Sequence, residues 1–314
     1  MTLLLQYTLI FASVLLLVAL GGCFAERSGV INIGLEGIMV IGALGGALML
    51  KFLPMSVGPL GMVLATVVVS ALFGMIFSLF LAVAAINFKA DQTITGTAMN
   101  MLATAGATVA VKAMNTSMSK GSDVSSDITY THTKDLLLVR IGNFEFNWFM
   151  LVAALCLVIA FIALYKTKFG LRLRACGEHP QAAASVGVDV LKMRYAGVLI
   201  SGLLGGLGGI VYITAGVSVW KFENGVAGFG FLAMAVMIFG GWHPLKIALA
   251  SLLFGFFRAL GNVYSGFDFM LALNIPSVVY NMLPYIISLV VLAFTSKKSQ
   301  GPKAAGIPYD KGVR

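Results

Sequence analysis

Long apolar runs follow one another along most of this chain, and they restrict it to a membrane fold. Several exceed the roughly 18 residues that indicate a membrane-crossing helix. The sequence therefore predicts an all-α integral membrane protein with about nine spans, within a range of roughly eight to ten. The predicted spans cover residues 3–22, 35–50, 57–86, 94–112, 148–165, 193–215, 229–242, 245–262 and 277–296.

Composition supports this class and excludes others. Charged residues make up 11% of the chain, against about 25% in soluble domains. The 36 glycines suit close helix contacts in a bilayer. The sequence has no P-loop, Rossmann fingerprint or hydrolase motif, so we expect no enzyme activity and no ATP hydrolysis by this chain. The cysteines and histidines show no metal-ligand spacing, and neither a metal nor another cofactor is expected.

Basic residues gather in two segments and set the expected orientation. The tail 297–314 has five Lys or Arg residues against one acid, and the connector 166–194 has six against two. Basic loops stay in the cytoplasm. We therefore expect a multi-pass plasma-membrane protein with both segments inside, the connector 113–147 outside and, with about nine spans, an extracytoplasmic N-terminus. The net charge of +9 then follows from topology and requires no nucleic-acid partner.

The two polar connectors differ in what they predict. The segment 113–147 is rich in Ser, Thr and Asp, and it fits a mobile cover, a docking surface or a solvated loop without a role. The connector 166–192 contains a helix-start signal followed by small residues and a terminating glycine. A capped helix exposed to water suits a protein whose conformation is changed by a soluble partner that binds this helix. The residues expected to make this contact are Glu178, His179, Pro180, Ala182, Ala183 and Gly187.

Two glycine-rich segments align without a gap and predict an internal repeat. Residues 28–46 and 224–242 share glycine or valine at five positions. By the span count, the two segments enter the membrane from opposite sides. Inverted repeats with glycine-broken helices place free backbone groups along a transport pathway; close packing by small residues is the alternative. We expect one transmembrane domain over residues 1–314, with a first repeat at about 1–165, a second at about 193–296 and the tail at 297–314.

A few polar residues lie within the predicted spans, where they are costly and often functional. Thr93, Thr97 and Asn100 share one helical face with Thr104. This uncharged face suits a neutral, hydroxyl-rich solute, although such residues also join helices. Glu36 fits either the pathway or an ion pair with Arg27 or Arg258. With the broken segments, the expected pathway residues are Asn32, Gly34, Glu36, Gly37, Thr93, Thr97, Asn100, Gly225, Gly230 and Phe231, the last as an aromatic surface or a packing residue.

Three motifs carry a family resemblance over most of the chain: ERSGVINIGLEGIMVIGA, KADQTITGTAMNMLA and GEHPQAAASVGV. The chain resembles permease subunits of ABC importers for simple sugars, branched-chain amino acids and nucleosides, most of all the nucleoside permeases that work with basic-membrane-protein-type lipoproteins. The resemblance implies a type II importer-like permease fold. It also implies a second related permease, a cytoplasmic ATPase with two nucleotide-binding modules and an extracytoplasmic binding lipoprotein. It assigns residues 178–187 as the coupling helix that docks on the ATPase.

Other functions remain open at this point. A ribose or other simple-sugar permease is the nearest alternative. An ion-coupled secondary carrier also uses inverted repeats, but it usually places several acids or an acid–histidine relay in the membrane, and here Glu36 is nearly alone. A membrane scaffold without transport activity has no need of broken helices at repeat-related positions.

Overall fold

A computed structural model describes residues 2–130, 137–141, 144–215, 219–266, 276–295 and 301–310. Within them, seven helices are long and apolar enough to cross a membrane. Each of the nine predicted spans corresponds to one helix, which confirms the predicted class. The long helices are α1 (Thr2–Arg27), α2 (Leu35–Phe52), α3 (Gly58–Ala82) continued by the π-turn η2 (Val83–Asn87), α4 (Gln92–Met118), α6 (Trp148–Lys166), α9 (Val190–Ile213) and α11 (Pro244–Val263). The other two are the 11-residue α10 (Phe229–Phe239) and α13 (Ser277–Thr295).

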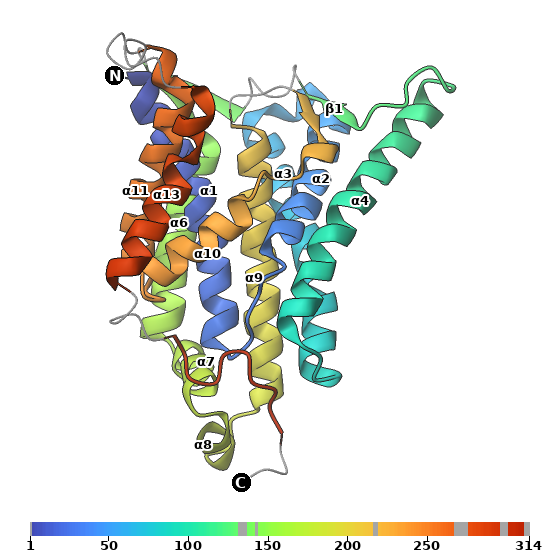
Figure 1. The fold of residues 1–314 in the computed structure, drawn as a ribbon. Coiled ribbons are helices and arrows are strands. Elements are labelled where there is room, and N and C mark those ends of the chain that lie inside the picture. The colour runs from blue at the N-terminus through green and yellow to red at the C-terminus, as the bar shows by residue number, and fades with distance from the viewer. Residues whose placement is uncertain are drawn as a thin grey trace.

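The α7–α8 connector and residues 301–310 lie at one end of the helix bundle, and the described strands of the connector 113–147 lie at the other (Figure 1). The N-terminus is at one end, together with four short strands. At that end β1 (Asp127–Thr129) pairs antiparallel with β4 (Val219–Lys221), and β2 (Leu138–Ile141) pairs antiparallel with β3 (Phe144–Asn147). The helices α7 (Lys168–Glu178) and α8 (Pro180–Ser185) lie at the other end with residues 301–310. This separation agrees with the charge asymmetry; the cytoplasmic location of the α7–α8 end stays a prediction.

The helices pack as two halves of inverted direction. α1 packs on α9 and α11, while α9 packs on α1 and α3, so the two halves make corresponding contacts. The segments that the sequence repeat aligned contain the first part of α2 and all of α10, and these two helices run in opposite directions (Figure 1). α6 packs on α1 and α11 and lies between the halves in sequence. The corresponding units in the described residues are therefore α1–α4 and α9–α13.

Glycines set how closely the central helices approach. A Cβ atom on Gly42 of α2 would collide with the backbone of Gly206 on α9, and one on Gly209 would collide with the Met39 carbonyl. Gly74 of α3 likewise lies against Gly202 and Gly206. Small residues allow backbones to meet in this way. These glycines thus allow α2, α3 and α9 to pack closely in the centre of the bundle.

Two connectors contain more regular structure than predicted. α4 was expected to end at residue 112 but continues to Met118. Asn115 is buried there, and its side-chain amide donates to the carbonyls of Ser125 and Asp127. The connector 166–192 contains α7 before α8, which the sequence reasoning missed. Its first turn is capped by Thr167, whose hydroxyl accepts from the Gly170 amide.

Some predicted features cannot be placed. Residues 131–136 of the 113–147 connector lie outside the described part of the chain, as do the basic residues Lys297, Lys298, Lys311 and Arg314 of the tail.

Candidate functional site

The N-termini of α2 and α10 meet inside the bundle, and Glu36 joins them. Its two carboxylate oxygens accept the backbone N–H groups of Gly228 and Gly230, at 2.7 and 2.6 Å. The first turn of a helix has free N–H groups and a partial positive charge, so a carboxylate is a suitable acceptor. A Cβ atom on Gly230 would lie 2.5 Å from the Glu36 nitrogen. Glycine is therefore required where the two helix ends touch.

The break before α2, residues 28–34, is held by side chains of neighbouring helices. The Asn100 side chain of α4 accepts from the Gly37 N–H at 2.8 Å and donates to the Ile33 carbonyl at 3.0 Å. Gln92, also on α4, accepts from the Ile31 N–H at 2.7 Å. Backbone groups without a helical partner are costly at membrane depth. These two side chains satisfy them, and they fix α4 to the break.

The break before α10 is held in a similar way from α13. The Tyr285 hydroxyl donates to the Ala227 carbonyl at 3.1 Å. Gly225 and Gly228 have positive φ angles of 56° and 79°, which glycine adopts without strain. The last helix of each half thus contributes a polar side chain to the break of its own half.

One face of the chain carries polar side chains that the chain itself does not cover. Thr93 and Thr97 of α4 are exposed, and Asn100 and Thr104 are partly exposed. A Cβ atom on Gly225 would lie 3.6 Å from the Thr104 hydroxyl, so the second break adjoins this face. Phe231 at the start of α10 is 48% exposed. We call Thr93, Thr97 and Thr104 the polar face.

The threonine hydroxyls of this face retain hydrogen-bonding capacity. Thr97 donates to the Thr93 carbonyl and Thr104 donates to the Asn100 carbonyl, each within its own helix. Each hydroxyl oxygen can still accept a hydrogen bond. The polar face can therefore accept hydrogen bonds from an uncharged solute.

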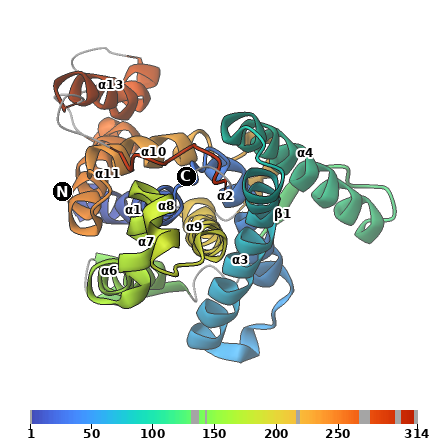
Figure 2. The ribbon, with the colours of Figure 1, turned by 90° about the horizontal axis from the view of Figure 1, so that it is seen from below.

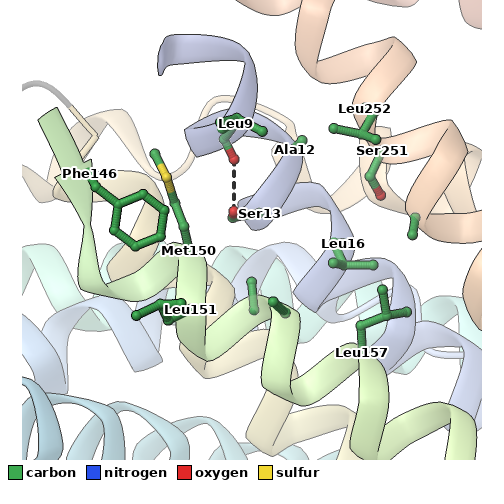
Figure 3. A pocket seen from close by; sticks show the side chains of 13 residues that line it. Leu9, Ala12, Ser13, Leu16, Phe146, Met150, Leu151, Leu157, Ser251 and Leu252 are labelled. Carbon is green, nitrogen blue, oxygen red and sulfur yellow. Dashed lines mark hydrogen bonds between the residues drawn. The ribbon is translucent and has the colours of Figure 1, made fainter. Parts of the chain in front are cut away.

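A separate cavity of about 400 Å³ lies between α1, α6 and α11. Figure 3 shows its lining, which is apolar apart from two serines. Ser13 donates to the Leu9 carbonyl at 2.7 Å, and Ser251 donates to the Ile247 carbonyl at 2.8 Å. The hydroxyl protons of both serines are thus already used in hydrogen bonds within their own helices. This lining suits hydrocarbon rather than a polar solute.

The short helix α8 forms as the sequence predicted. Pro180 occupies its first turn, His179 is its N-cap residue, and Gly187 follows it with a φ angle of 83°. Glu178 ends α7 and lies 3.6 Å from Arg27. Ala182 is exposed, whereas Ala183 is buried against Cys176 and Val190 of this chain. Ala183 therefore packs α8 against the rest of the chain. The surface that α8 offers to another molecule includes Ala182.

A known permease family matches almost the whole chain. Residues 4–294 match the family described as the branched-chain amino acid transport system / permease component. The chain belongs to this family. The resemblance inferred from the three sequence motifs is thereby confirmed.

Two relatives match over nearly the full length of the permease, and a third matches over a shorter part. It is 41% identical to the guanosine ABC transporter permease protein NupQ of Bacillus subtilis (strain 168), over 98% of this chain and 96% of that protein. It is 39% identical to the nucleoside ABC transporter permease protein NupC of Lactococcus lactis subsp. cremoris (strain MG1363), over 96% of this chain and 95% of that protein. The nucleoside ABC transporter permease protein NupB of the same strain is 26% identical over 76% of this chain and 67% of its own length.

The predicted site residues of the permease separate into three groups. Glu36, Gly37, Asn100 and Gly230 belong to the contacts that hold the breaks. Asn32 is buried and donates to the Ser201 hydroxyl at 2.8 Å. Gly34 is buried beside it, so a larger residue there would press on Asn32 and Met99. Of the remaining predicted pathway residues, Thr93 and Thr97 lie on the polar face and Gly225 lies beside Thr104. Phe231 is exposed at the start of α10.

The sequence reasoning gave no role to three residues that hold the breaks of the permease: Gln92, Ser201 and Tyr285. Tyr285 follows Pro284 inside α13, and a polar side chain next to a helix-disturbing proline was a usable signal. Ser201 gave no signal, because serine inside an apolar helix commonly bonds to its own backbone.

Proposed function

We propose that this chain is the membrane permease subunit of an ABC importer for nucleosides and forms half of the translocation pathway. The observation that carries the proposal is the uncovered polar face beside two broken helices whose ends meet at Glu36. Thr93 and Thr97 are exposed in the single chain, which fits a pathway shared with a second subunit. The printed names of NupQ and NupC support a nucleoside as the solute.

The other subunits follow from the same proposal. NupB and NupC are both named as permeases of a nucleoside ABC transporter in one strain, which supports pairing with a second, related permease. An ATPase with two nucleotide-binding modules binds the cytoplasmic end, and a binding lipoprotein delivers solute at the other. The basic residues around α7 and α8 support the cytoplasmic placement of that end and of the tail.

Uptake by the complete complex in proteoliposomes tests this function. The permease with its partner permease, ATPase and binding lipoprotein is expected to accumulate labelled guanosine only when ATP is supplied. Excess unlabelled uridine or adenosine is expected to reduce the signal, and excess ribose is not. Competition by ribose alone would indicate a sugar permease. Uptake driven by a proton or sodium gradient without ATP would indicate a secondary carrier and contradict the proposal.

The proposed role of α8 gives a separate prediction. Ala182→Trp is expected to lower uptake at least about tenfold while the permease still inserts, because a bulky side chain at an exposed contact position prevents close docking on the ATPase. ATP hydrolysis by the complex should no longer respond to the loaded binding lipoprotein. Ala113→Trp, another exposed alanine but on α4 near the opposite end, is the control and should leave this response intact. Normal coupling in Ala182→Trp would show that α8 docks elsewhere or not at all.

A further inference from the structure

Residues 301–310 form an irregular strap across the end of the molecule that carries α7 and α8. Figure 2 shows this segment passing beneath α10 and ending near α2. Its backbone is bound to the bundle at three points. The Ala304 N–H donates to the Gly177 carbonyl at 2.8 Å, and the Gly306 N–H donates to the Gly29 carbonyl at 3.3 Å. The Ile307 carbonyl accepts from Arg194 at 2.9 Å.

Side chains of the strap add further contacts. Ala304 is 6% exposed. A Cβ atom on Gly301 would lie 3.1 Å from the Trp242 ring. Asp310 pairs with Lys89 at 2.8 Å, and Tyr309 packs on the buried cluster beneath α8. The segment is thus seated along most of its length.

The strap contacts both halves of the inverted fold. Gly29 and Lys89 belong to the first half, before α2 and before α4. Arg194 and Trp242 belong to the second half, on α9 and after α10. The two halves therefore cannot separate at this end unless strap contacts break.

Arg194 is a buried cation that binds the strap. Its side chain is 1% exposed, and its Nε and Nη2 atoms have no hydrogen-bond partner among the described residues. A buried charge with unpaired donors is unfavourable. When the strap leaves, the Ile307 contact is lost but water reaches the guanidinium group.

We propose that residues 301–310 are a cytoplasmic gate: seated, the strap closes the inner end of the pathway, and it must leave its seat for solute release. The proposal rests on the function proposed above, because it assumes that α7 and α8 face the cytoplasm and the ATPase. Through Tyr309, the strap shares a packing cluster with α8. Movement of α8 by the ATPase therefore disturbs the seat of the strap.

Cross-linking the strap to its seat tests the gate in the assembled complex. Lys89→Cys combined with Asp310→Cys places two exposed thiols where an ion pair lies, and a bifunctional thiol reagent with a cleavable disulfide spacer joins them. ATP-driven guanosine uptake is expected to fall at least tenfold on cross-linking and to return on reduction. The control is the pair Asp189→Cys and Lys192→Cys, whose wild-type side chains form an exposed ion pair at the start of α9. Its cross-link should not change uptake.

The two proposals fail in different ways. If the Lys89/Asp310 variant takes up no guanosine before cross-linking while the wild-type complex also takes up none, the proposed nucleoside import is wrong. If the cross-linked variant takes up guanosine at the uncross-linked rate, the gate is wrong and the import proposal is unaffected.

A second measurement reports strap movement without relying on uptake. Ala304→Cys places a thiol at a buried strap position, and its reaction rate with a polar maleimide is expected to rise at least fivefold during ATP turnover. Lys303→Cys is next to it but exposed, and its rate should stay constant. An unchanged rate at position 304 during turnover would overturn the gate.

Discussion

Glu36→Ala is expected to reduce ATP-driven uptake at least about tenfold while the permease still inserts in the membrane. The substitution leaves the N–H groups of Gly228 and Gly230 without their acceptor. An unsatisfied buried donor costs about 1–3 kcal/mol, and about 1.4 kcal/mol corresponds to a tenfold change in population. The joined ends of α2 and α10 should therefore lose their alignment. Uptake in proteoliposomes measures the effect.

Two further variants define what Glu36 does. Glu36→Gln keeps one acceptor oxygen and the side-chain shape, so partial uptake that still requires ATP is expected. Glu223→Ala is the control, because Glu223 is an exposed acid that pairs with Lys112 at 2.6 Å near the strand end of the bundle. Exposed ion pairs contribute little, and uptake should be unchanged. Wild-type uptake by Glu36→Ala would show that the contact between α2 and α10 has no role in transport.

Gly42→Leu is expected to prevent stable folding rather than to alter transport. A side chain at this position meets the Gly206 backbone, which cannot move without separating α2 from α9. Overpacking typically costs about 1–3 kcal/mol and more where the neighbour cannot yield. The yield of monodisperse permease in detergent and its thermal unfolding midpoint should both fall sharply.

A matched pair of alanine variants isolates the close approach from the change of residue type. Gly42→Ala should lower the unfolding midpoint, whereas Gly106→Ala should leave it unchanged or raise it. A Cβ atom on Gly106 has no neighbour within 4 Å, and alanine is favoured over glycine within a helix by about 0.5–1 kcal/mol. Equal midpoints for the two alanine variants would mean that α2 and α9 do not depend on this contact.

Local signals in the sequence were sufficient for the class and for much of the layout. Each predicted span is a helix, because a long run of apolar residues in a membrane forms a helix whichever neighbours it packs against. Likewise, α8 begins at Pro180 and is followed by Gly187, because caps depend on residues within a few positions. The aligned glycine segments also gave the two breaks, since the residues before a helix largely decide where it starts.

The sequence did not determine the partner of each polar side chain. Glu36 was expected in the pathway or in an ion pair, and neither expectation named the N-terminus, 192 positions away in the chain, that its carboxylate binds. Asn100 lies on the predicted threonine face, yet its amide is occupied by the backbone around α2. Nothing local distinguishes a side chain that meets solute from one that meets backbone. Only the packing of α2 against α4 and α10 makes that distinction.

The same limit applies to Ala183 and to the strap. Ala182 and Ala183 are neighbours in a short helix, and only the position of α7 and α9 beneath α8 decides which of them is buried. The tail was expected to be a basic cytoplasmic segment, and its composition does not encode a return across the bundle to Gly29 and Arg194. The sequence by itself thus determined the helices, their order and their ends, because these follow from hydrophobic length and local capping. The tertiary structure alone decided which helix ends meet and which residues the tail contacts, because those contacts join residues far apart in the chain.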